Sequence, residues 1–476
     1  MSALRPALVH ARHPVAIVGL TDDALDVVTA CCAARGLGHP DASTIDDLAA
    51  RISDGVVAGA WIDAEPATAA ALAPAARAAA LATRPLLVLA RIPRGRAIET
   101  AASLAYLRAH GAAVFTDPDA WIEALCLVAA HGAPAGPRTS VVAPDGGYLA
   151  VASRTLGPDD GRRPSWASRA DELAPTDVVL VARASWAEAA AAPPSTALRI
   201  PLVERAELLG AAPAGALVGL RAALAATTTV GRAAERARAG LGPAGRSARA
   251  ELEVDEDRLA RQLAKLATGD VRLGDHESKT LLSAYGVAIT RQAVATSTSA
   301  ALRIAAKAGF PVDVKPWGPD VVSERDGCPI ERDLTTAADV RRAFAAVLTR
   351  AGQPVDRGAV IVRASPAPGR EVSARIAQLP HLGWTVIVET PGQPPEAAPA
   401  PLRVADAAAL AAVVIATRAG DDEPDRVGLA NLLRRASHLT VDHAGQITRL
   451  DLGRIVVGPK GAETLVVDAE ITLAPR

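Results

Sequence analysis

The sequence has few aromatic residues and almost no methionine: among 476 residues there are six Trp, three Tyr, three Phe and a single Met. Half of the residues are nevertheless hydrophobic. The apolar content is therefore mostly Ala, Val and Leu, which predicts helix-rich cores built from small side chains. The scarcity of aromatic rings also excludes the stacking platforms on which many proteins bind single-stranded nucleic acid.

Neither sign of charge dominates, because 51 Lys and Arg residues face 52 Asp and Glu residues, a net charge of −1. A nucleic-acid-binding protein needs a basic excess, so we expect no nucleic-acid partner. Uninterrupted apolar runs are also lacking. The Ala-rich stretch 66–82 contains Pro74 and Arg77, whereas a membrane helix needs ~20 consecutive apolar residues. The N-terminus has no secretory signal pattern. We therefore expect a cytoplasmic protein without a membrane partner.

Paired cysteines are absent as well. None of the four cysteines lies in a CxxC spacing, which argues against a zinc site or a disulfide framework. We expect them to be small buried hydrophobic residues in a reducing compartment. They are Cys31, Cys32, Cys126 and Cys328.

The length suggests about three domains, at roughly 150 residues per domain. In residues 10–133 short β-branched runs alternate with helical ones, which predicts a parallel sheet covered on both faces. The expected strands are 14–20, 56–63, 84–90 and 112–115, and the expected helices between the first three are 25–38, 45–53 and 66–82. After a Pro/Gly break, residues 138–230 predict a second, less regular α/β domain. Residues 231–256 are Arg- and Ala-rich and are expected to form an interdomain helix or linker. From 257 to 476 the pattern predicts an α+β domain with antiparallel hairpins, in which strands 358–366 and 369–379 are expected to pair.

The last domain carries several motif blocks in a fixed order. Taken together they resemble the ATP-grasp domain of the NDP-forming (ADP-forming) acyl-CoA synthetases, the acetate–CoA ligase family related to succinyl-CoA synthetase. Segments 76–89 and 95–103 resemble the same family's flavodoxin-like ligase domains. The resemblance implies two such domains followed by the ATP-grasp domain. The ATP-grasp blocks are 277–287, 295–315, 369–372, 437–442, 450–457 and 466–471.

The resemblance also implies roles for individual residues. Lys315 matches the strand lysine that contacts nucleotide phosphates, Glu371 matches a glutamate of the nucleotide site, and Asp451 matches a Mg²⁺ ligand. Gly146 and Gly147 match the glycine turn opening the second ligase-like domain. Their backbone N–H groups could hold an anion, or the pair could form an ordinary tight turn.

The sequence departs from the family pattern at several of these positions. The family's D-x-N-P motif continues here as Gly453 and Arg454, so an oxygen ligand is lost and a cation is added. The H-K-S/T-D motif is replaced by Ser-Glu-Arg-Asp at 323–326, and the glycine-rich loop after it is shortened. We therefore expect affinity for ATP or ADP with Mg²⁺ to be weak or lost.

The phosphohistidine of the family's S-H-T-G motif is also missing, because Ser103 is followed by Leu104. We therefore assign no catalytic residue. His110 and His131 are possible substitutes, but each precedes a glycine at a predicted helix end, where capping is an ordinary role. The N-terminus resembles a start after the family's CoA-binding domain, so we expect no CoA binding by this chain alone.

Three hypotheses remain open. We favour a catalytically degenerate family member that serves as a scaffold or regulatory subunit. The second is a working ADP-forming acyl-CoA ligase subunit completed by a partner chain, either an intact paralogue or another copy of itself. The third is a module that binds a nucleotide or CoA metabolite without turnover.

Overall fold

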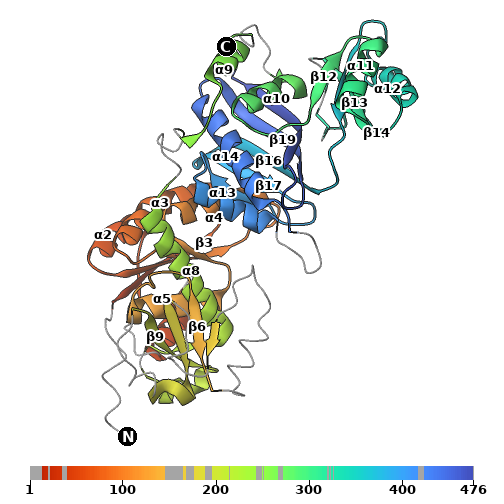
Figure 1. Ribbon diagram of the computed structural model, residues 1–476. Coiled ribbons are helices and arrows are strands. Elements are labelled where there is room, and N and C mark those ends of the chain that lie inside the picture. Colours follow the sequence, from red (N-terminus) through yellow and green to blue (C-terminus); the bar gives the residue numbers. More distant parts are fainter. Residues whose placement is uncertain are drawn as a thin grey trace. The chain divides into compact units, whose positions relative to one another are not determined.

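The computed structural model shows a chain that divides into two compact units, Met1–Gly242 and Pro243–Arg476 (Figure 1). Each unit has its own sheets and its own cores. The structure describes residues 13–19, 22–34, 40–144, 165–167, 176–187, 196–213, 215–242, 249, 251–265, 272–318, 321, 323–324, 326–415 and 423–474.

The first sheet of the N-terminal unit is entirely parallel, with the strand order β2-β1-β3-β4-β5. This is the flavodoxin-like order, so the predicted parallel α/β class is confirmed. Its strands are β1 (Val15–Val18), β2 (Asp41–Ala42), β3 (Val57–Asp63), β4 (Leu87–Arg91) and β5 (Ala113–Phe115). The helices that alternate with them are α1 (Asp22–Ala34), α2 (Ile45–Ser53), α3 (Pro66–Leu81), α4 (Ala97–Ala109) and α5 (Pro118–His131).

The second sheet repeats this winding. Its order is β10-β9-β8-β6-β7, again all parallel, which is the flavodoxin-like order counted from β6. The strands are β6 (Thr139–Val142), β7 (Ser165–Ala167), β8 (Val178–Ala182), β9 (Leu198–Val203) and β10 (Leu217–Val218). Two short 3₁₀ helices, η2 (Arg183–Ser185) and η3 (Ala206–Ala211), and the long α8 (Leu220–Ala239) complete the unit.

A single core joins the two parallel sheets. It contains residues of both sheets together with α5 and α8, which pack against each other. Helix α5 is buried on nearly all sides, and its Trp121 is one of the few large side chains in this core, with its indole Nε1 donating to the carbonyl oxygen of Leu87 at 2.9 Å. The small-residue core is thus confirmed, and Cys32 and Cys126 belong to it. Helix α8 continues to Ala239, beyond the predicted domain end at 230.

The C-terminal unit contains two antiparallel sheets. The smaller has the order β12-β15-β13-β14 and is covered by α11 (Thr298–Ala308) and α12 (Ala337–Arg350). Its strands are β12 (Gln292–Ala295), β13 (Val312–Trp317), β14 (Glu331–Leu334) and β15 (Ala359–Ala364).

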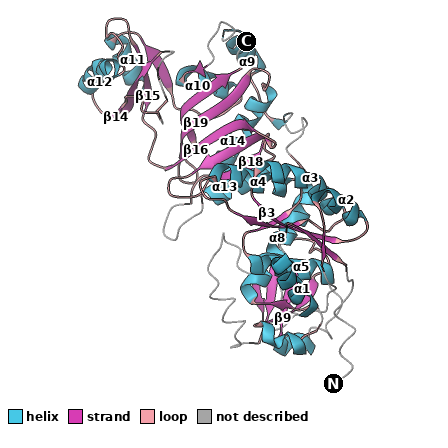
Figure 2. Cartoon of the chain, turned by 180° about the vertical axis from the view of Figure 1, so that it is seen from behind, coloured by secondary structure: helices cyan, strands magenta, loops and turns pink. Residues whose placement is uncertain are grey.

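The larger sheet has six strands in the order β11-β20-β19-β16-β17-β18. Helices α13 (Val404–Val414) and α14 (Arg426–Asp442) pack against it (Figure 2). Helix α10 (Asp275–Ala284) contacts β20, and α9 (Glu256–Lys265) packs against α10. The strands are β11 (Arg272–Leu273), β16 (Arg370–Leu379), β17 (Gly383–Glu389), β18 (Glu396–Pro399), β19 (Ile447–Val457) and β20 (Leu465–Leu473).

Antiparallel hairpins β16–β17 and β19–β20 confirm the predicted α+β class. The sequence pattern also suggested that strands 358–366 and 369–379 pair with each other, and this is wrong. Strand β15 pairs with β12 and β13, whereas β16 pairs with β17 and β19 in the other sheet. The connecting segment contains Pro366 and Pro368, which lack the N–H groups of a tight hairpin turn, and it carries the chain from one sheet to the other.

Within the described residues, no helix is long and apolar enough to cross a membrane.

Candidate functional site

Lys315, the predicted phosphate-contacting lysine, lies on the buried strand β13. Its side chain is only 4% exposed, and its ammonium is surrounded by carboxylates. The Nζ atom lies 2.8 Å from Asp468 Oδ1, 3.0 Å from Glu324 Oε1 and 3.1 Å from Asp275 Oδ2. An ammonium group has three N–H donors. The three carboxylates therefore neutralise Lys315 from within the protein, and two of them, Asp468 and Glu324, accept hydrogen bonds from its Nζ.

Two more buried cations extend this cluster. On β15, Arg363 donates from Nε to Asp313 Oδ2 at 3.0 Å and also pairs with Glu324. On α10, Lys279 lies 3.1 Å from Asp275 Oδ1 and donates to Gln292 Oε1 at 2.8 Å. Both cations also donate to the carbonyl oxygen of Val467 on β20. We call this set the buried ion network. Its members are Asp275, Lys279, Asp313, Lys315, Glu324, Arg363 and Asp468.

The electrostatics keep most of the network ionised. Burial disfavours the charge of Lys315, but Asp275, Asp468 and Glu324 outweigh burial and raise the pKa of the ammonium above its usual range. Burial would likewise raise the pKa of Glu324, yet Lys315 and Arg363 outweigh it and lower that pKa to about 2. For Lys279, burial is stronger than the attraction of Asp275 and lowers the pKa to about 8.

Glu324 links the network to the altered motif of the sequence. It stands where the resemblance leads one to expect the lysine of H-K-S/T-D, so the charge at this position is reversed. Its carboxylate accepts from Lys315 and Arg363, and its Oε2 also lies 2.9 Å from the NH2 of the half-exposed Arg332. The substituted residue is therefore a direct partner of the lysine whose expected ligand is a phosphate.

The two other predicted site carboxylates are held by arginines on the six-stranded sheet. Glu371 on β16 lies 2.9 Å from the Nε of Arg454, the residue that replaces the proline of D-x-N-P. Asp451 on β19 pairs through Oδ1 with Arg375 at 2.9 Å and through Oδ2 with Arg449. The carboxylate of Asp451 is therefore engaged at both oxygens.

A magnesium–nucleotide complex does not fit this arrangement. The N–H donors of Lys315 are taken by carboxylates, and the oxygens of Asp451 are taken by guanidinium groups. In the part of the chain that the structure describes, no group of three or more His, Cys, Asp or Glu side chains is arranged to hold a metal ion. We therefore derive no reaction step through a nucleotide or a metal.

In the N-terminal unit, a buried leucine stands at the position that corresponds to the family's phosphohistidine. Leu104 lies on α4 and is buried, with 7% exposure. His110 caps α4, donating from Nδ1 to the carbonyl oxygen of Tyr106 at 2.8 Å, and burial lowers its pKa. His131 ends α5, and its Nε2 lies 2.8 Å from the carbonyl oxygen of Gly215. Gly146 and Gly147 fall outside the described residues.

Sequence reasoning missed most of the buried ion network. The signal that could have revealed it is a charge inside an otherwise apolar strand, because such residues are rarely buried unless paired. Asp313 in Val-Asp-Val, Arg363 in Val-Arg-Ala and Asp468 in Val-Asp-Ala all have this pattern. All three are buried, and Arg363 is completely inaccessible.

Comparison with known proteins assigns the region that contains the network. Residues 264–473 match the protein family described as "ATP-grasp domain". These residues form an ATP-grasp domain. Every member of the buried ion network lies inside it.

Curated proteins are homologous to part of this chain. The acetate–CoA ligase [ADP-forming] II subunit beta of Pyrococcus furiosus is 24% identical over 222 residues, covering 44% of this chain and 94% of that protein. The 4-hydroxybutyrate–CoA ligase [ADP-forming] of Nitrosopumilus maritimus is 24% identical over 213 residues, covering 42% of this chain and 30% of that protein. The alignments thus span nearly all of one relative and less than a third of the other.

Solved structures give matches of similar extent. The dinucleotide-forming acetyl-coenzyme A synthetase 1 of Ca. Korarchaeum cryptofilum, in complex with coenzyme A, Ca-AMPCP and HgCl⁺, is 25% identical, with a TM-score of 0.41 over 45% of this chain and 99% of that chain. The protein PH1788 from Pyrococcus horikoshii is 22% identical, with a TM-score of 0.42 over 46% of this chain and 99% of that chain.

Proposed function

We propose that this chain is a catalytically degenerate relative of the ADP-forming acyl-CoA ligases and that it acts in the cytoplasm as a scaffold or regulatory subunit. The observation that carries the proposal is the position of Lys315, whose ammonium is bound by Asp275, Glu324 and Asp468. Phosphoryl transfer depends on cations placed to neutralise phosphate charge in the transition state. A lysine neutralised by three internal carboxylates does not supply that charge.

The remaining chemistry points the same way. Asp451 and Glu371 are paired with arginines, so neither presents a carboxylate free to attract a cation. Leu104 has no atom that can accept a phosphoryl group. The groups for three separate tasks of the ligase reaction are therefore either engaged by other side chains or replaced.

The proposal includes a partner chain. The P. furiosus relative is named as a beta subunit, and the alignment covers 94% of it. By analogy, the partner of this chain is an intact paralogue that carries the missing residues, or a second copy of this chain. A scaffold of this kind would contribute its surface and its stability to the assembly.

The first test measures turnover and nucleotide binding by the purified full-length chain. Acetyl-CoA, phosphate and Mg·ADP are supplied, and ATP formation is followed by a luciferase assay, while calorimetry measures Mg·ATP binding. We expect no ATP formation and no micromolar affinity. Micromolar Mg·ATP binding that disappears in Lys315→Ala, with the variant shown by circular dichroism to be folded, would show that the nucleotide site works and would overturn the proposal.

A second test examines the phosphoryl relay. The chain is incubated with γ-³²P-ATP or with acetyl-CoA and ³²P-phosphate, and acid-labile, base-stable labelling is measured. We expect no label, because Leu104 replaces the acceptor and His110 and His131 are bonded to backbone carbonyls. Labelling that is lost in His110→Gln or His131→Gln, with the other variant as the matched control, would identify a substitute acceptor.

A working ligase subunit is the second candidate, favoured by the near-complete alignment with a beta subunit. It differs from the first in one outcome. If copurification with an intact paralogue gives ligase activity that Lys315→Ala in this chain abolishes while circular dichroism shows the variant to be folded, the chain contributes catalysis. Activity that is unchanged by Lys315→Ala but lost when this chain is omitted supports the scaffold role.

A further inference from the structure

The Glu324 carboxylate is held the way proteins hold an oxyanion. Its Oε1 accepts from Lys315 at 3.0 Å and also from Arg363 NH1, while its Oε2 accepts from Arg363 NH2 at 3.3 Å and from Arg332 NH2 at 2.9 Å. Two oxygens thus receive four hydrogen bonds from three cationic side chains. Charge-assisted bonds of this kind, with one guanidinium contacting both oxygens, are typical of carboxylate and phosphate recognition.

The three cations come from strands of the four-stranded sheet, and their anion comes from the connection between β13 and β14. Lys315 and Arg363 lie on the neighbouring strands β13 and β15, and Arg332 lies on β14. Glu324 belongs to none of these strands. The cations are therefore arranged by the fold of the sheet, and the side chain of Glu324 supplies the negative charge.

Charge balance explains why this position requires an anion. The buried ion network contains four carboxylates and three cations, and Arg332 adds a fourth cation at its half-exposed edge. Without Glu324, three carboxylates would face four cations. A buried charge that loses its partner is strongly destabilising, so another anion is favoured in the vacated place.

We propose that Glu324 is a built-in occupant of an anion site formed by Lys315, Arg363 and Arg332, and that it excludes phosphate groups from these cations. The contact is autoinhibitory: the internal carboxylate is present at very high effective concentration and neutralises the charges that a phosphate would need. This inference rests on the proposed function, because it gives a cause for the loss of nucleotide affinity.

The chemical class of the displaced ligand follows from the donors. A phosphate has at least three acceptor oxygens and carries about two negative charges, so it can use all four N–H groups that now bond to Glu324. Inorganic phosphate and the terminal phosphate of a nucleotide share this chemistry. The experiment must therefore separate the two sources.

The test compares phosphate binding by wild type, Glu324→Ala and Glu324→Gln. Glu331→Ala is the matched control: it removes one carboxylate from β14, where Glu331 pairs with Arg350 at the surface. Inorganic phosphate, ADP and Mg·ATP are titrated separately by calorimetry, and thermal unfolding is recorded with each ligand. Circular dichroism confirms that each variant is folded.

We expect Glu324→Ala or Glu324→Gln to bind at least one of the three ligands at least about tenfold more tightly than wild type, which corresponds to one lost competing ion contact. The gain should vanish in Lys315→Ala/Glu324→Ala and be absent in Glu331→Ala. A gain for phosphate alone identifies a small oxyanion site, and a larger gain for Mg·ATP identifies a nucleotide site.

Two other results are distinguishable from each other. If both Glu324 variants are folded and bind no ligand better than wild type, the autoinhibitory contact is overturned while the degenerate function stands. If wild type itself binds Mg·ATP with micromolar affinity through Lys315, the proposed function fails first. Should Glu324→Ala unfold, Glu324→Gln retains the side-chain volume. The presence or absence of a rise in its melting temperature with phosphate then decides whether the Glu324 contact is autoinhibitory.

Discussion

A Cβ atom at position 453 would lie 2.6 Å from the Oδ2 of Asp468, so the buried Asp468 carboxylate occupies the space that a side chain at Gly453 would need. The distance is too short for a real contact, and Asp468 is fixed by its ion pair with Lys315. Gly453 stands where the resemblance leads one to expect the asparagine of D-x-N-P. The loss of that side chain thus allows Asp468 to reach the lysine on the neighbouring sheet.

We predict that Gly453→Ala destabilises the C-terminal unit, because the methyl group displaces a buried, charged side chain. Overpacking of this kind costs about 1–3 kcal/mol in the free energy of unfolding. Urea denaturation followed by circular dichroism measures the change. The control is Gly445→Ala, at an exposed turn with no atom within 4 Å of the added Cβ. Equal stabilities of the two variants would show that Asp468 does not depend on Gly453.

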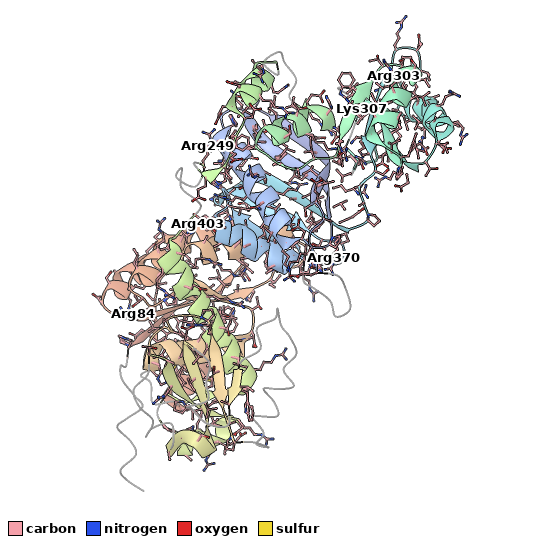
Figure 3. The ribbon with its side chains drawn as sticks, viewed as in Figure 1. Arg84, Arg249, Arg303, Lys307, Arg370 and Arg403 are labelled. Atoms are coloured by element: carbon pink, nitrogen blue, oxygen red, sulfur yellow. The ribbon has the colours of Figure 1, made fainter. Side chains whose placement is uncertain are left out.

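We predict that Lys315→Met is strongly destabilising, because it leaves Asp275, Glu324 and Asp468 without their shared ammonium. Removing one partner from a buried ion cluster typically costs about 3–5 kcal/mol. The control is Lys307→Met on α11, whose side chain is exposed (Figure 3), and a surface change of this kind is worth within about 0.5 kcal/mol. Chemical denaturation of both variants gives the comparison. A lysine kept for ligand contact would instead leave stability nearly unchanged and affect binding alone.

We predict that Glu324 contributes to the acid sensitivity of the fold. Lys315 and Arg363 overcome the effect of burial and lower its pKa from 4.5 to about 2. The unfolded chain therefore takes up this proton at a higher pH than the folded chain, and stability falls as the pH drops from about 4.5 toward 2. In Glu324→Gln the loss of stability between pH 6 and pH 3 should be smaller by about 2 kcal/mol.

Denaturant titrations at a series of pH values check this slope. Glu331→Gln is the control, since it removes a surface carboxylate from the same sheet. Identical pH profiles for wild type and Glu324→Gln would contradict the ionised, paired state of Glu324.

Much of the fold could be predicted from the sequence because its long elements have clear periodicity. The apolar runs that became β1, β3 and β4 and the helices between them were expected close to their observed bounds. Short strands such as β2 and β14 were missed, since two residues, or the charged run Glu-Arg-Asp, give no alternating pattern. The partner of β15 was wrong because strand pairing depends on where the chain crosses between sheets.

The location of the candidate site could be predicted from the sequence, but the ion pairs that neutralise Lys315 could not. The motif blocks placed Lys315 on a strand of an ATP-grasp domain, and the structure agrees. Its partners Asp275 and Asp468 lie far apart in the sequence, on α10 and β20, and only the tertiary fold brings them to one ammonium. A motif records which residue is present, whereas the neutralisation of Lys315 depends on all the residues around it.

The alanine-rich helices of the N-terminal unit have a consequence for how this protein can be studied. Most buried positions of α3 are alanine already, and α5 buries Ala120, Ala124, Ala129 and Ala130. Alanine-scanning mutagenesis gives no information at these alanine positions, although they form part of the interior of the unit. Steric probes are needed there instead: at Gly59, for example, an added Cβ would meet Trp121 and Leu125 at 3.2 Å. In such a core, the informative measurement is the change in stability when a small side chain is replaced by a larger one.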